Sequence, residues 1–134
     1  MNPVLRPELR YRRLWFLVGL VLALGVTVIC LMPTSKLPDV RLWDKLEHSL
    51  GWVSLAYWFG AVVVRRDLAW VGVALLLLGG AIELLQGAMG LGRSADLRDL
   101  LADAVGIGIG LLLVLSPLGR LPVWLESRLF RVRA

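Results

Sequence analysis

Asp44-Lys45-Leu46-Glu47-His48 places four ionisable side chains at the start of an apolar segment that continues to Val64. His48 is the only histidine of the chain. In a helix, Asp44, His48 and Gly51 share one face, because their spacing is i, i+4 and i+7. The segment therefore predicts an apolar helix whose first turns carry a polar face.

The composition of the 134-residue chain indicates an integral membrane protein. Hydrophobic residues make up 58% of the sequence and the mean hydropathy is +0.76, both above the usual range of a soluble domain. Four spans with short connections use nearly the whole chain, so we expect one all-α membrane domain over residues 1–134. The net charge of +5 does not indicate nucleic-acid binding, because the arginines cluster at the ends of apolar segments.

Four apolar segments are the predicted spans of a polytopic, four-transmembrane-helix bundle. The first contains nineteen residues without a charge, which exceeds the apolar core of a signal peptide, so we expect it to be retained. The predicted spans cover residues 14–32, 44–64, 68–89 and 97–115. Residues 118–134 mix large apolar side chains with four arginines and predict a short amphipathic segment on the cytoplasmic membrane surface, with a frayed soluble tail as the alternative.

The basic residues predict how the bundle is oriented. The N-terminal arm, the turn between the second and third spans, and the tail together carry ten lysine or arginine residues, whereas the opposite side carries five. Cytoplasmic loops of membrane proteins carry the excess of basic residues. We therefore expect a multi-pass protein of the bacterial cytoplasmic (inner) membrane with both termini in the cytoplasm.

Acidic residues concentrate on the predicted outer side, which holds seven of the ten. With a rise of about 1.5 Å per residue, His48, Glu83 and Asp103 lie roughly 6 to 10 Å inside their spans. An acid facing lipid at the span centre costs about 2.5 to 3.5 kcal/mol, so we expect these groups to face inward around an outward-open polar pocket.

Nine residues are the predicted ligand-binding set of this pocket: Asp44, Lys45, His48, Glu83, Gln86, Arg93, Asp96, Asp99 and Asp103. Glycines on the same helix faces allow close helix approach, and the predicted packing positions are Gly51, Gly79, Gly106 and Gly110.

Three motifs in this order resemble the VanZ-like family of small membrane proteins. They are Asp44, Lys45 and His48; Glu83 and Gln86; and Arg93, Ser94, Ala95, Leu97 and Asp99, followed by the glycine-rich span with Gly106 and Gly110. The resemblance covers about residues 33–115. Asp103 is a departure, since the family usually has Asn at that position. The family takes its name from a protein associated with resistance to teicoplanin, so the resemblance implies a cell-envelope setting and leaves the biochemical activity open.

Several of these residues also have a structural interpretation. Asp44 can cap its helix while Lys45 extends to the membrane surface. His48 can be a core histidine hydrogen-bonded to one of the aspartates. For Glu83 a functional interpretation is favoured, because a carboxyl group one to two turns inside a span usually serves a function.

Arg93 and Asp96 can form an ion pair at the loop, which would contribute little to stability. The single cysteine, Cys30, excludes an intramolecular disulfide and is expected to be a small core residue.

A binding function is the favoured prediction. The pocket would receive the polar head group of an outer-leaflet amphiphile, such as a lipid-linked envelope precursor or an amphiphilic antibiotic, without a cofactor or nucleic acid. Lys45, Arg93 and His48 would contact phosphate or carboxylate groups, and the acids would bind amines and hydroxyls.

Two other functions stay open. A metal-dependent hydrolase or transferase would use His48, Glu83, Asp99 and Asp103 as ligands, although no dedicated metal motif or activated nucleophile identifies a catalytic residue. A proton-coupled transporter would need a second half of its relay, because the cytoplasmic halves of the spans are nearly free of ionisable residues. A homo-oligomer would have to supply it.

Overall fold

The computed structural model describes residues 4–32, 41–89 and 97–130, with side chains from residue 49 onward in the second range. This part of the chain is helical almost throughout, and its isolated β-bridge pairs Leu5 with Val63. The α-helices are α1 (Arg12–Cys30), α2 (Arg41–Val62), α3 (Leu68–Met89), α4 (Leu97–Leu115) and α5 (Leu121–Leu129). Two short 3-10 helices, η2 (Arg65–Asp67) and η3 (Pro117–Arg120), precede α3 and α5.

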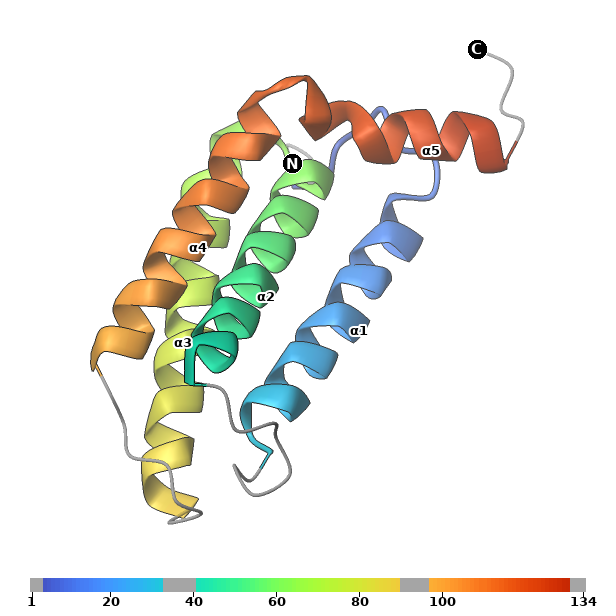
Figure 1. Ribbon diagram of the computed structural model, residues 1–134. Helices are drawn as coiled ribbons and strands as arrows, with labels where there is room; N and C mark the ends of the chain where they lie inside the picture. The colour runs from blue at the N-terminus through green and yellow to red at the C-terminus, as the bar shows by residue number, and fades with distance from the viewer. Residues whose placement is uncertain (1–3, 33–40, 90–96, 131–134) are drawn as a thin grey trace.

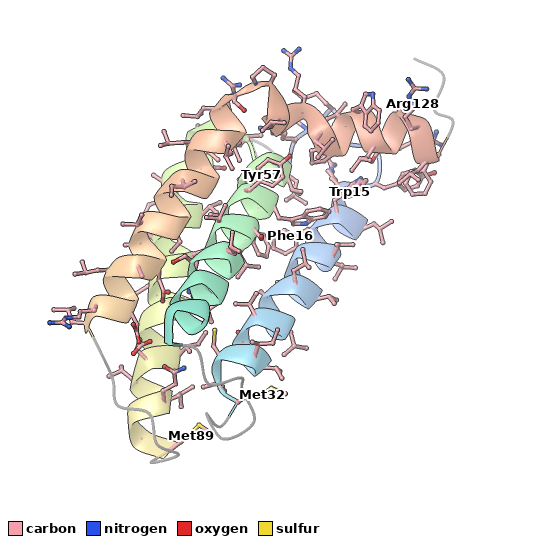
Figure 2. All side chains as sticks on the ribbon, in the orientation of Figure 1. Trp15, Phe16, Met32, Tyr57, Met89 and Arg128 are labelled. Carbon is pink, nitrogen blue, oxygen red and sulfur yellow. The ribbon has the colours of Figure 1, made fainter. Side chains whose placement is uncertain are left out.

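Helices α1 to α4 run side by side, and α5 lies across one end of them (Figure 1). That end also holds the N-terminal segment and η2, and we call it the terminal end. At the opposite end, called the loop end, α1 and α3 finish and α2 and α4 begin. Figure 2 shows Met32 and Met89 at the loop end and Tyr57 and Arg128 at the terminal end.

Two helical segments of the described part are long and apolar enough to cross a membrane, namely Arg12–Cys30 and Arg65–Met89. A third is counted if α4 and the following Pro117–Leu129 segment form one span, although the two parts meet at a 73° bend. The described part of α2 with side chains, Ser49–Val62, is apolar but shorter. The helices are therefore compatible with a membrane, and four spans stay a prediction.

The helix bounds differ only slightly from the predicted spans. Helices α3 and α4 cover the predicted ranges, α1 lies two residues earlier, and α2 begins at Arg41 and ends at Val62. Pro117 explains the end of α4, because the residue before a proline is driven out of the helical region. Ser116 is indeed extended, with φ −79° and ψ 175°, and its Oγ accepts a hydrogen bond from the Leu118 N–H.

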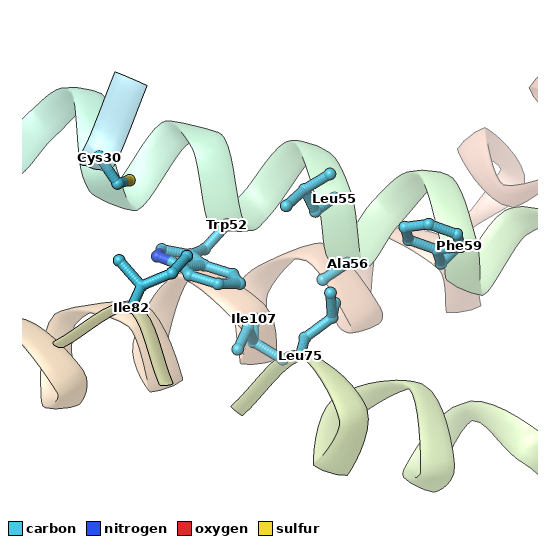
Figure 3. Close-up of a cluster of buried hydrophobic side chains, with 8 residues drawn as sticks. All are labelled: Cys30, Trp52, Leu55, Ala56, Phe59, Leu75, Ile82 and Ile107. Carbon is cyan, nitrogen blue, oxygen red and sulfur yellow. The ribbon is translucent and has the colours of Figure 1, made fainter. Parts of the chain in front are cut away.

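The core lies around α2, whose largest fully buried side chain is Trp52. Figure 3 shows the Trp52 ring extending from α2 toward Ile82 of α3 and Ile107 of α4. Cys30, at the end of α1, is buried in the same cluster, as a small core residue would be. One set of apolar side chains thus joins all four long helices.

Glycines bring α2 and α4 into the closest helix contact of the bundle. A Cβ atom added at Gly110 would lie 2.5 Å from the Val53 carbonyl oxygen, and one at Gly106 would lie 2.8 Å from the Ser49 carbonyl oxygen. At Gly51 the nearest atom, on Val26, would lie 3.3 Å away, which is less restrictive. Backbone atoms of α2 therefore occupy the space that side chains on α4 would need.

At the terminal end, the N-terminal segment joins α2 to η3. Arg6 donates from Nε to the Val63 carbonyl at 3.1 Å and from Nη1 to the Gly119 carbonyl at 2.8 Å. Its backbone N–H also donates to the Val62 carbonyl at 2.9 Å. The last carbonyls of a helix lack intrahelical partners, so Arg6 satisfies the end of α2.

Glu126 of α5 binds the start of α1 in a similar way. Its carboxylate accepts hydrogen bonds from the Arg10 N–H at 2.7 Å, the Tyr11 N–H at 3.0 Å and the Trp15 indole N–H at 2.9 Å. A negative charge is favourable at a helix N-terminus, where backbone N–H groups are unpaired. The predicted tail is therefore an ordered helix as far as Leu129, and the alternative of a frayed tail is wrong for this part.

The close packing of α2 and α4 predicts that Gly110→Ala destabilises the protein by about 1 to 3 kcal/mol, because the added methyl group forces the helices apart. Thermal unfolding in detergent measures the effect. Gly108→Ala is the matched control on the same helix, since nothing lies within 4 Å of a Cβ atom there, and it should leave stability unchanged or raise it by up to about 1 kcal/mol, because alanine favours the helix more than glycine does. Equal stability of the two variants would contradict the packing described above.

Candidate functional site

Three acidic residues from α3 and α4 gather in the half of the bundle toward the loop end. Glu83 is 6% exposed and Asp103 is 2% exposed, whereas Asp99 is partly buried. The carboxylates of Glu83 and Asp99 both interact electrostatically with that of Asp103. We call these three residues the carboxyl cluster.

Helix geometry explains how the carboxyl cluster forms. Asp99 and Asp103 are one turn apart on α4, so they share a face. Gly79 of α3 leaves room for the second of them, because a Cβ atom at Gly79 would lie 3.1 Å from Asp103 Oδ2. The absence of a side chain at Gly79 of α3 thus leaves space for the Asp103 carboxyl group of α4.

Trp52 closes the cluster from the side of α2. Its indole N–H approaches the Asp103 carboxyl group without reaching hydrogen-bond geometry. Within the described part of the chain, Trp52 Nε1 and Asp103 Oδ1 are both buried and have no hydrogen-bond partner. Burying polar atoms in this way costs free energy, so the cluster has hydrogen-bonding capacity beyond what the described side chains use.

Gln86 has a structural hydrogen bond that its motif did not predict. Its Nε2 donates to the backbone carbonyl of Cys30, at the end of α1. That carbonyl is one of the helix-end acceptors that lack an intrahelical partner. Gln86, one turn after Glu83, therefore joins α3 to α1, and one donor of its side-chain amide is used in this contact.

Glu83 lines a groove between α3 and α4 with a cavity volume of about 610 Å³. The other lining residues are apolar: Leu76, Leu77, Gly80, Ala81, Leu84, Leu97 and Leu100. Several of these leucines are exposed, which places the groove on the side of the bundle. A single carboxyl group therefore stands in an otherwise apolar surface that would face the bilayer interior.

This groove differs from the predicted pocket, which was expected between three helices. Among the described residues, the close contact of α2 with α4 and the ring of Trp52 fill the space between the helices at the level of Asp103. The predicted pocket also involves residues nearer the loop end that lie outside the described part, so it stays a prediction. The groove that Glu83 lines lies on the outer side of α3 and α4. Asp103 does not line the groove.

The remaining predicted site residues fall outside what the structure describes. The backbone at Asp44, Lys45 and His48 forms the first turns of α2, one turn or more before Trp52, but their side chains lie outside the described residues. Arg93 and Asp96 lie outside them entirely. The meeting of basic residues with the carboxyl cluster therefore stays a prediction.

The described residues contain no group of three or more His, Cys, Asp or Glu side chains arranged to hold a metal ion. The carboxyl cluster alone therefore does not form such a group. The predicted metal set also included His48, whose side chain is outside the described part.

The fold and the site together define a helical protein with membrane-compatible helices and an acidic residue in an apolar side groove. No family model, curated protein or solved structure matches the chain. The resemblance to the VanZ-like family accordingly rests on the three motifs of the sequence.

Proposed function

We propose that the chain is a VanZ-like, four-span protein of the cell envelope that binds an amphiphile in the groove between α3 and α4. The supporting observation is the buried carboxyl group of Glu83 in a groove that is otherwise lined by apolar residues. An amphiphile would enter sideways from the bilayer and place its apolar chain against the leucines. Its polar head group would reach Glu83.

The acids favour a head group that donates hydrogen bonds. A carboxylate accepts from amines and hydroxyls, and charge-assisted bonds are the stronger of these. Asp99 and Asp103 belong to the same cluster, and either adds negative potential when it is ionised, which favours a protonated amine over a neutral hydroxyl. A lipid-linked envelope precursor or an amphiphilic antibiotic carrying an amine has this chemistry, and binding it would change susceptibility to glycopeptide antibiotics.

In this proposal all four long helices cross the bacterial inner membrane. Helix α2 has 22 residues, which corresponds to roughly 33 Å of helix and is sufficient to span the hydrocarbon core. The excess of basic residues at the terminal end supports cytoplasmic termini. Glu83 would then lie in the outer half of the bilayer, and the exposed Leu121, Trp124 and Leu129 of α5 would rest on the cytoplasmic surface.

This orientation predicts the behaviour of reporter enzymes fused within the chain. An alkaline phosphatase inserted at Gly92 should be active, because this enzyme requires an oxidising compartment, whereas the same insertion after Ala134 should be inactive. Cytosolic β-galactosidase fusions at the two positions should give the reverse pattern. Phosphatase activity at the C-terminus and none at Gly92 would contradict the orientation.

Binding at Glu83 predicts a charge-dependent affinity for amphiphilic amines. In proteoliposomes, Glu83→Gln should weaken binding of a fluorescent long-chain amine about tenfold or more, because it removes a charge-assisted hydrogen bond. Binding of the matching long-chain alcohol should change much less. Glu8→Gln, at an exposed acid of the terminal end, is the matched control and should bind both probes as the wild type does.

The Glu83→Gln substitution should also have a consequence in cells. Cells expressing wild-type protein should differ in teicoplanin susceptibility from cells expressing Glu83→Gln, with both proteins inserted in equal amounts. Equal amine binding by wild type and Glu83→Gln would refute the proposed site.

A further inference from the structure

A second groove lies between α1 and α3 in the half of the bundle toward the terminal end, with a cavity volume of about 380 Å³. It exists because α1 packs chiefly on α2, which leaves a gap beside α3. Its lining is apolar except for one acid and consists of Val4, Phe16, Leu20, Ala23, Phe59, Val63, Asp67, Trp70, Val71, Ala74, Leu75 and Leu78. None of these residues belongs to the carboxyl cluster.

The length of this groove matches one leaflet of a bilayer. Its residues on η2 and α3 run from Asp67 to Leu78, which corresponds to roughly 16 Å along the helix axis. The hydrocarbon core is about 30 Å thick, so half of it is about 15 Å. Trp70 is 72% exposed near the terminal end of the groove, where an aromatic side chain would reach the interface.

Basic residues stand on both walls at the terminal end of this groove. On one wall, Arg65 and Arg66 lie between the lining residues Val63 and Asp67, and both arginines are exposed. Arg66 Nε lies 3.6 Å from Asp67 Oδ1, which partly neutralises the acid of the lining.

On the other wall, Arg12 and Arg13 are exposed and precede Phe16 by one turn of α1. These four exposed arginines, Arg12, Arg13, Arg65 and Arg66, adjoin lining residues at the terminal end of the groove, and we call them the basic mouth.

We infer that this groove binds one acyl chain of an anionic glycerophospholipid, whose phosphate lies at the basic mouth. The apolar lining alone gives no preference among phospholipids, because bulk lipid offers the chain a similar environment. Selectivity comes from the mouth, since basic residues next to a membrane attract anionic head groups. This site is separate from Glu83 and requires only that the protein is inserted in a membrane. The inference can therefore be tested independently of the proposed function.

Native mass spectrometry tests the inference on full-length protein released from nanodiscs that contain equal amounts of phosphatidylglycerol and phosphatidylcholine. The wild type should retain one phospholipid, with about a tenfold preference for phosphatidylglycerol. The double variant Arg65→Gln/Arg66→Gln should lose most of this preference. Arg120→Gln/Arg128→Gln removes two arginines at the same end of the bundle, in η3 and α5, and should keep it.

Variants that fill the groove with a larger side chain test whether the lipid acyl chain lies there. Ala74→Phe on α3 should abolish retention of either lipid while the arginines stay in place, and Ala23→Phe does the same from α1 if the first variant does not fold. Equal retention of both lipids by the wild type would overturn the inference, as would an equal loss in the two arginine variants. A wild-type dimer that Ala74→Phe converts to a monomer would assign the groove to a second copy instead.

Discussion

The contact of α2 with α4 at Gly106 and Gly110 is the constraint on which the rest of the bundle depends. Because backbone atoms of α2 occupy the space beside these glycines, no side chain fits there. The contact places Trp52 between the helices and beside Asp103, so the described part of the bundle is filled at this level. The groove between α3 and α4 lies on the side of the bundle, and Glu83 is the residue of the carboxyl cluster that lines it.

Unpaired backbone groups at helix ends take part in several polar contacts between distant segments of the described chain. Arg6 binds carbonyls at the end of α2, Gln86 binds the Cys30 carbonyl, and Glu126 binds N–H groups at the start of α1. These groups would otherwise be buried without partners, at a cost comparable to a lost hydrogen bond each. Charged and amide side chains therefore connect the helices at the ends of the bundle, whereas apolar packing and close contacts at glycines stabilise its middle.

Local patterns in the sequence predicted the helices and their bounds to within about three residues, because apolar length, proline and loop composition act within each segment. They also indicated Gly106, Gly110 and Glu83, whose positions follow from helical spacing. They missed the partners of Arg6, Gln86 and Glu126, since those contacts join residues 56 to 116 positions apart. Glu126, the single acid among the four arginines of residues 118–134, was the one available signal.

The central claim is that carboxyl groups of α3 and α4 gather in one interacting cluster, of which Glu83 also lines the side groove. A double-mutant cycle of Glu83→Gln and Asp103→Asn, read from thermal unfolding in detergent, tests it most directly. If the carboxylates repel each other, the double variant should gain less stability than the sum of the single variants, by about 1 kcal/mol. Additivity to within about 0.5 kcal/mol would contradict the account.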